Sequence, residues 1–85
     1  MYEILFSETA LKHLKKLPQN IQKRVVSVLE RIKVRPYAFL RKLVVSPYFR
    51  LRVGDYRVIL DVRKEQLIIF VIEVAHRKKI YKKLL

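Results

Sequence analysis

The spacing of apolar residues changes from helical to strand-like along the chain. Between residues 18 and 34, apolar side chains recur every three or four positions, which places them on one helix face: Ile21, Val25, Val28, Leu29 and Ile32. From Phe49 to Val53, apolar and charged residues alternate strictly, as in a strand with one buried face. The chain is therefore expected to combine helices with a sheet.

The segment before that helix predicts a strand and a further helix. Residues 2–6 have the composition of a short strand, and Ser7 is a typical N-cap, with Glu8 placed where the helix dipole favours an acid. Apolar residues then follow at helical spacing: Ala10, Leu11, Leu14 and Leu17. Pro18 ends this helix and can begin the next, which Arg35-Pro36 ends in turn. Two antiparallel helices joined by a tight turn are expected.

The second half of the chain predicts three strands joined by short turns. Residues 35–48 form a connection with apolar anchors, and Gly54-Asp55 is a two-residue hairpin turn between strands 49–53 and 56–62. After a polar turn at 63–66, residues 67–74 are apolar on both faces, which indicates a central strand covered on both sides. A basic tail begins at Ala75. The expected class is α+β: an N-terminal strand, a two-helix hairpin and a three-stranded antiparallel meander, with the helices packed on one sheet face.

Composition narrows the possible functions. The 85 residues include one Gly and three Pro, so no flexible linker is expected and residues 1–85 should form a single domain. A formal charge of +13 with 52% hydrophobic residues argues against a disordered tail and favours a polyanionic partner, nucleic acid first and an anionic membrane surface second. The absence of Cys excludes disulfides, Cys-bound zinc and a thiol nucleophile. With no signal peptide or apolar run of about 20 residues, a cytoplasmic protein is expected.

The hairpin register places three arginines together. If Gly54-Asp55 is the turn, Arg50, Arg52 and Arg57 share one face of the sheet, and Leu51 and Val58 share the face toward the helices. Like charges directly opposite each other destabilise a sheet, so an unpaired arginine cluster favours a phosphate site, where guanidinium groups donate bidentate hydrogen bonds. The alternative is that these arginines only solvate an exposed sheet face.

The C-terminal segment adds further basic residues and a tyrosine. Arg77, Lys78 and Tyr81 follow the last expected strand and would lie next to the basic face. Tyr81 can stack on a base or donate a proton from its phenol, or it can be a buried structural tyrosine. The sequence itself offers no conventional acid–base pair, neither paired histidines nor a carboxylate beside one.

Several stretches of the sequence resemble the RelE/ParE superfamily of toxins from toxin–antitoxin pairs. Residues 48–60 (YFRLRVGDYRVIL) and 74–81 (VAHRKKIY) are similar to its most recognisable segments, and 14–18 (LKKLP) and Lys42-Leu43 are also similar. The resemblance covers essentially the whole chain. It implies one of two activities: ribosome-dependent mRNA cleavage, as in RelE-type mRNA interferases, or inhibition of DNA gyrase, as in ParE-type members.

The resemblance also implies a set of site residues. The basic cluster and the C-terminal tyrosine of RelE-type members correspond to five residues of this chain, which are the catalytic candidates: Arg50, Arg52, Arg57, Arg77 and Tyr81. Candidate RNA-binding residues are Lys42, His76, Lys78 and Lys79. Because all five catalytic positions carry compatible side chains, the RelE-type activity is favoured, with attack by the RNA's own 2′-hydroxyl and with no cofactor or metal. A gyrase inhibitor and a non-catalytic nucleic-acid-binding module remain alternatives.

The partners implied are a cognate acidic, RelB-like antitoxin and the ribosome with its mRNA, contacted through ribosomal RNA. The toxin–antitoxin complex is further expected to bind its own operator DNA, and no membrane partner is expected.

Overall fold

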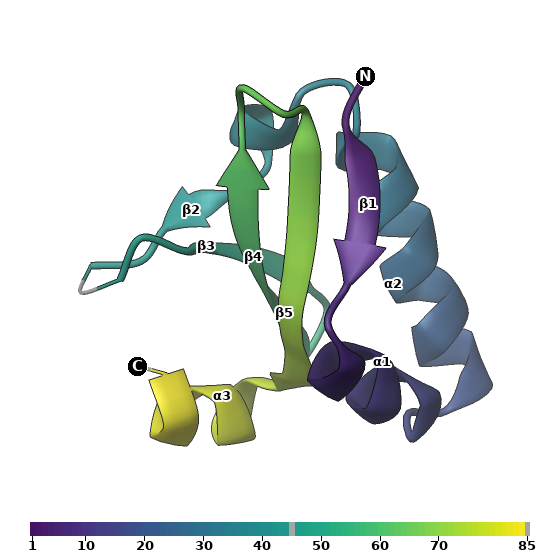
Figure 1. Cartoon of the computed structure of the whole chain (residues 1–85). Coiled ribbons are helices and arrows are strands. Elements are labelled where there is room, and N and C mark those ends of the chain that lie inside the picture. The colour runs from purple at the N-terminus through teal and green to yellow at the C-terminus, as the bar shows by residue number, and fades with distance from the viewer. Residues whose placement is uncertain (45, 85) are drawn as a thin grey trace.

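The computed structural model describes residues 1–44 and 46–84, with side chains described as far as Ile80. Five strands form one sheet in the order β1-β5-β4-β3-β2 (Figure 1). The elements in chain order are β1 (Glu3–Phe6), α1 (Glu8–Lys15), α2 (Gln19–Ile32), a 3-10 turn η1 (Pro36–Ala38), β2 (Arg41–Lys42), β3 (Phe49–Val53), β4 (Tyr56–Arg63), β5 (Ile68–His76) and α3 (Arg77–Leu84). The α+β class, the N-terminal strand and the antiparallel meander β3-β4-β5 are confirmed.

The first helix begins where the sequence predicts. The hydroxyl of Ser7 accepts a hydrogen bond of 3.0 Å from the main-chain nitrogen of Ala10, and it donates one of 3.0 Å to the carbonyl of Ile72 in β5. This single side chain therefore caps α1 and fastens it to the sheet. Pro18 stands immediately before α2, as expected from its fixed φ.

The sheet contains two pairings that the sequence did not predict. β1 runs parallel to β5, with Glu3 opposite Ile68, so the first and last strands are neighbours. β2 is a two-residue strand within the expected connection, and it pairs antiparallel with β3. The meander is thus extended on both sides into a mixed sheet.

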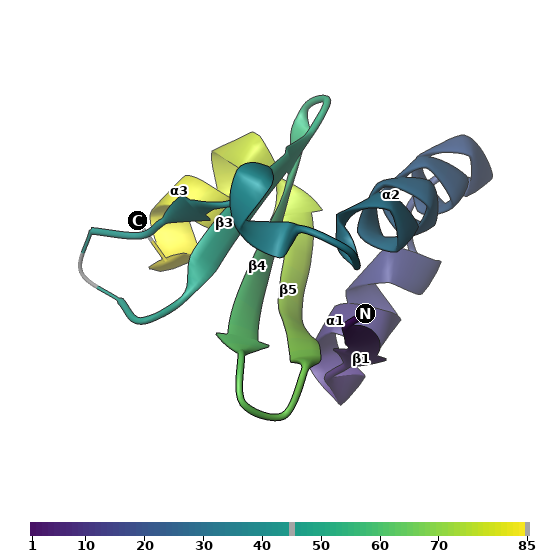
Figure 2. The same ribbon diagram turned by 90° about the horizontal axis from the view of Figure 1, so that it is seen from above.

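The main core lies between one face of the sheet and the helices α1 and α2. Its buried residues come from every part of the chain, and include Ala10, Leu14, Val25, Leu29, Leu51, Val58, Ile69 and Val71. Figure 2 shows α1 and α2 on one side of β4 and β5, with α3 on the other. The expected central position of the last strand is confirmed, since β5 lies between β1 and β4.

The expected basic tail is a helix. β5 continues past Val74 to His76, and α3 starts at the next residue. Ile80 of α3 is fully buried in a small second core with Leu43, Ile59 and Ala75, on the sheet face opposite the main core. The many basic residues of this short segment leave few apolar positions to show a helical period, so the sequence predicted a basic tail without a helix. No helix in the described range 1–44 and 46–84 is long and apolar enough to cross a membrane.

Candidate nucleic-acid site

Four arginines and one aromatic residue line a cavity of about 300 Å³ on the sheet face opposite α1 and α2. We call it the arginine cavity, and its lining residues are Phe39, Arg41, Arg50, Arg52 and Arg57. Arg41 comes from β2, Arg50 and Arg52 from β3, and Arg57 from β4. Three adjacent strands therefore supply guanidinium groups to one space.

Strand register explains this convergence. Arg52 lies directly opposite Arg57, and Arg50 lies opposite both Ile59 of β4 and Arg41 of β2. The expected hairpin register is confirmed pair by pair. Because side chains alternate between faces, these arginines point away from the main core that Leu51 and its neighbours fill.

Arg57 differs from the other arginines of the cavity. It is 6% exposed, whereas Arg41 and Arg52 are exposed to solvent. Its Nη1 donates hydrogen bonds of 2.9 Å to the carbonyl oxygens of Gly54 and Tyr56, so the hairpin turn holds the guanidinium in place. The remaining N–H groups, on Nε and Nη2, stay available to a ligand in the cavity.

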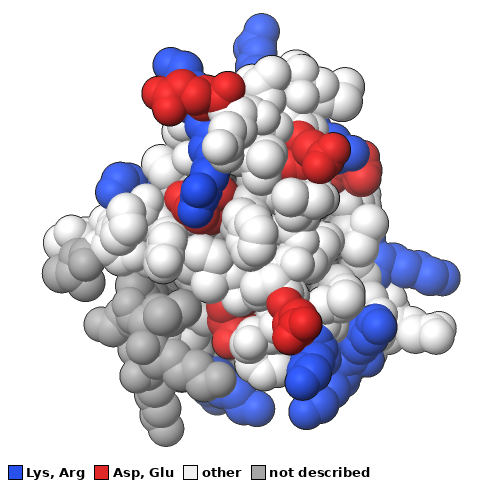
Figure 3. Space-filling model, in the orientation of Figure 1, with Lys and Arg blue, Asp and Glu red and all other residues white. Residues whose placement is uncertain are grey.

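The arginine cavity carries uncompensated positive charge. In the described part of the chain, the ion pairs are His13–Glu73, Lys33–Glu30 and Arg63–Asp61, and none includes an arginine of the cavity. On the face drawn in Figure 3, by contrast, acidic side chains lie beside basic ones around a largely uncharged centre. A cluster of guanidinium groups with no acid among them is suited to bind phosphate.

Arg77 is near the arginine cavity but does not line it. It is the first residue of α3, and its main-chain nitrogen donates a 2.8 Å hydrogen bond to the carbonyl of Asp55 in the same turn that holds Arg57. Its side chain is exposed. The turn thus brings the beginning of α3 close to the arginine hairpin.

The other C-terminal candidates are spread around this end of the molecule. Lys78 and Lys79 are exposed on α3, and His76 is half-buried at the end of β5, where its Nδ1 accepts a hydrogen bond of 3.2 Å from the nitrogen of Lys78. The side chain of Tyr81 lies outside the described residues.

Lys42 is not part of the arginine cavity. It lies opposite Phe49, so its side chain is on the other face of β2 from Arg41. Its Nζ donates to the carbonyl of Ser46 at 3.1 Å and lies 5.8 Å from the centre of the Phe49 ring. Arg41 was missed because a two-residue strand is too short to show an alternation.

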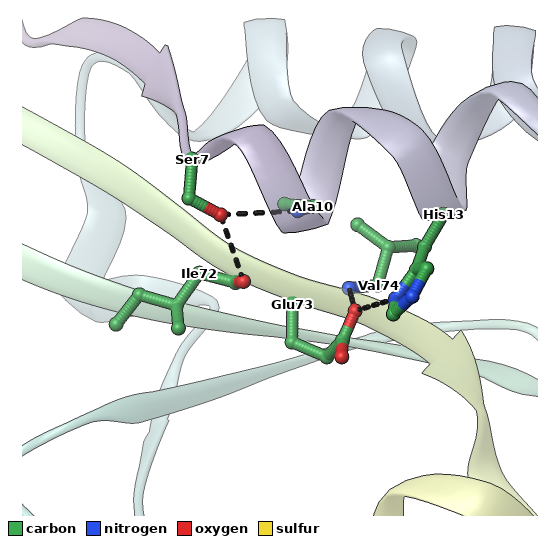
Figure 4. A network of polar contacts seen from close by, with 6 residues as sticks. All are labelled: Ser7, Ala10, His13, Ile72, Glu73 and Val74. Carbon is green, nitrogen blue, oxygen red and sulfur yellow. Dashed lines mark hydrogen bonds and ion pairs between the residues drawn. The ribbon is translucent and has the colours of Figure 1, made fainter.

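The expectation that no carboxylate stands beside a histidine is wrong. Nδ1 of His13 in α1 lies 2.5 Å from Oε1 of Glu73 in β5, and the same oxygen accepts a 2.9 Å hydrogen bond from the nitrogen of Val74 (Figure 4). The two residues are 60 positions apart in sequence, and only the packing of α1 on β5 brings them together.

Comparison with known proteins agrees with this architecture. Residues 4–81 match the family described as the ParE toxin of type II toxin–antitoxin systems, parDE. Toxin RelE3 of Methanocaldococcus jannaschii is 33% identical over 85 residues, which cover 93% of this chain and 94% of that protein.

Solved structures show the same fold. The toxin–antitoxin complex RelBE2 of Mycobacterium tuberculosis contains a chain that is 28% identical with a TM-score of 0.83, covering 89% of this chain and 98% of that one. The intact RelBE complex of Escherichia coli contains one that is 30% identical with a TM-score of 0.77, at coverages of 89% and 96%.

Proposed function

The chain belongs to the RelE/ParE superfamily of toxins from type II toxin–antitoxin systems, and from this membership we propose that it is a ribosome-dependent endoribonuclease. It cleaves mRNA in the ribosomal A site and thereby inhibits translation in the cytoplasm. The observation that carries this proposal is the arginine cavity, in which Arg57 is buried and fixed by two main-chain carbonyls.

The proposed reaction is an internal transesterification of RNA. The 2′-oxygen attacks the adjacent phosphorus and loses its proton, while the bond from phosphorus to the 5′-oxygen breaks and that oxygen gains a proton. The products are a 2′,3′-cyclic phosphate and a 5′-hydroxyl. Such a reaction requires donors that meet the charge developing on the phosphate oxygens, and fixed donors do so without reorganisation.

Each candidate residue has a role in this proposal. Arg57 and Arg77 stabilise the charge on the phosphate, and Arg50 and Arg52 hold the flanking phosphates in line for attack. Arg41 joins this second group because it lies opposite Arg50. Tyr81 stacks on the scissile nucleotide or assists proton transfer. The ribosome orients the mRNA, which suits a site built mainly from binding groups.

A partner of opposite charge accompanies this function. The M. tuberculosis and E. coli relatives were solved as complexes with antitoxins. We propose that this chain, at +13, is likewise neutralised by an acidic antitoxin that docks on the open edge of β1 or on the helix pair. Other basic residues, among them Lys42, Lys78 and Lys79, contact ribosomal RNA, and the antitoxin complex binds operator DNA.

Primer extension on a translated mRNA tests the proposed activity. The wild-type chain is expected to produce cuts within codons in the A site, and Arg77→Ala is expected to abolish them while ribosome binding persists. Arg77 is a better target than Arg57. The side chain of Arg57 is buried and hydrogen-bonded to two carbonyls, whereas that of Arg77 is exposed. Full cleavage by Arg77→Ala would refute the assignment of this residue. Absence of cleavage by the wild-type chain on translating ribosomes would refute the proposed activity.

A second candidate function is inhibition of DNA gyrase. It is favoured by the family match, whose description names the ParE toxin. A supercoiling assay with purified gyrase separates the two activities, because an mRNA interferase is expected to leave supercoiling unchanged.

A further inference from the structure

A second cavity, of about 270 Å³, lies where α1 meets the ends of β4 and β5 and the start of α3. Five polar side chains line it: His13, Lys16, Tyr56, His76 and Lys79. They lie in or next to four elements, α1, β4, β5 and α3, and four of them can donate hydrogen bonds into the cavity when both rings are neutral: Lys16, Tyr56, His76 and Lys79. We call this space the histidine cavity. Its remaining wall is apolar and includes Leu17 and Ala75.

Both imidazole rings are held by their Nδ1 atoms. Oε1 of Glu73 accepts two hydrogen bonds, one from the main-chain nitrogen of Val74 and one, of 2.5 Å, from Nδ1 of His13 (Figure 4). Nδ1 of His76 accepts from the nitrogen of Lys78 at 3.2 Å, and its ring meets Tyr56 edge to face at 5.4 Å between centroids. The ring orientations are thus set before any ligand arrives.

These contacts determine whether the Nε2 atom of each ring donates or accepts a hydrogen bond. Because Nδ1 of His76 accepts a hydrogen bond, the proton of the neutral ring is on Nε2, which is therefore a donor. Nδ1 of His13 carries the proton that Glu73 accepts, so Nε2 of its neutral ring is an acceptor.

The charge of the histidine cavity favours an anion. Among the described side chains, no acid lines it, and Glu73, the acid behind His13, is 7% exposed and bonded to His13 and Val74. None of the ion pairs found in the described residues includes Lys16 or Lys79. Two ammonium groups and oriented ring nitrogens surround a space large enough for a tetrahedral anion with an attached sugar.

We propose that the histidine cavity binds a phosphate group, either of an RNA backbone or of a free nucleotide. Tetrahedral phosphate oxygens accept several hydrogen bonds at once, which matches donors converging from α1, β4, β5 and α3. The site is distinct from the arginine cavity, because the two cavities share no lining residue. The proposal does not depend on RNA cleavage.

The chain contains two histidines, and both line the histidine cavity, so imidazole NMR signals report on this site alone. The probes are inorganic phosphate, uridine 5′-monophosphate and a 2′-O-methyl oligonucleotide that cannot be cleaved. We expect both histidine signals to shift along one saturation curve. Lys16→Ala and Lys79→Ala should each raise the apparent Kd about tenfold, the loss expected for one charge-assisted contact. Lys12→Ala is the matched control, since it removes the same charge from α1 outside the cavity.

The probes distinguish the two sources of phosphate. Tighter binding of the oligonucleotide, weakening steeply with salt, would assign the site to an RNA backbone, whereas tighter binding of the monophosphate than of either inorganic phosphate or the oligonucleotide would assign it to a free nucleotide. The proposal is overturned if no probe shifts the histidine signals, or if Lys12→Ala weakens binding as much as Lys16→Ala. Arg52→Ala, in the arginine cavity, should leave the histidine shifts with inorganic phosphate intact, so this site and the proposed cleavage can fail independently.

Discussion

The main-chain nitrogen of Arg77 donates a hydrogen bond of 2.8 Å to the carbonyl oxygen of Asp55. The adjacent carbonyl, that of Gly54, accepts from the side chain of Arg57. One two-residue turn therefore positions two proposed catalytic arginines, Arg57 of β4 and Arg77 at the start of α3. Changes at this turn should affect both arginines together.

Gly54→Ala should destabilise the chain by about 1 kcal/mol or more. Gly54 has a φ of 59°, which side chains with a Cβ adopt at a cost, and an added Cβ would stand 3.0 Å from Nη1 of Arg24. Urea denaturation measures the loss. Gly54→Asn is the matched comparison, because Asn tolerates positive φ better than Ala does. If Gly54→Ala unfolds at the same urea concentration as the wild type, the strain inferred here is absent.

Arg57→Ala should lower the free energy of unfolding by about 1–3 kcal/mol, because two carbonyls of the turn lose their donor. Arg57→Lys should lose less stability, since an ammonium can still donate to one carbonyl. Cleavage should nevertheless fall sharply in both variants, because Lys cannot present the planar fork of a guanidinium. Chemical denaturation and primer extension on the same preparations separate the two effects. Equal stability of all three proteins would contradict a structural role for Arg57.

Arg41→Ala should reduce mRNA cleavage about tenfold without lowering stability. Its side chain is exposed and lies opposite Arg50, so its removal relieves a like-charge pair. Lys64→Ala removes the same charge from the exposed turn between β4 and β5, outside the arginine cavity, and serves as the control. Comparable cleavage by the two variants would show that the position of Arg41 in the cavity does not matter.

Ser7→Ala should cost about 1–2 kcal/mol, since it removes the cap of α1 and a hydrogen bond to β5. Thermal unfolding of this variant is compared with that of Ser27→Ala, which changes an exposed serine within α2. A smaller loss for Ser7→Ala than for Ser27→Ala would exclude the capping role.

Ile80→Ala should weaken the packing of α3 on the sheet by about 2–4 kcal/mol, because Ile80 is fully buried against Ile59 and Leu43. Hydrogen exchange of the amides in α3 is the direct measurement, and it should become faster. Lys78→Ala, at an exposed position of the same helix, should leave that exchange unchanged.

Local patterns predicted the parts of this fold that depend on local chemistry. The Ser7 cap, the α2 stripe and the turn at Gly54-Asp55 each follow from a few neighbouring residues, and the turn alone specifies which arginines share a face. The core of the arginine cavity could therefore be predicted from sequence.

The features that were missed depend on contacts between distant segments. The pairing of β1 with β5 and the bond between His13 and Glu73 join residues at least 60 positions apart, and no local pattern reports them. The short strand that carries Arg41 has only two residues, so it can be recognised only from its pairing with β3 in the structure. Among the described side chains of α3, Ile80 packs into the second core, and so short a segment shows no clear amphipathic pattern.

The pairing of β1 with β5 also sets when the molecule can be completed during its synthesis. Residues 3–6 leave the ribosome before their partner strand, which starts at Ile68, has been translated. Until then β1 has no neighbour in the sheet, and α1 and α2 cover a core that is still incomplete. A toxin proposed to act on ribosomes therefore completes its sheet only after the segment that carries β5 has been synthesised.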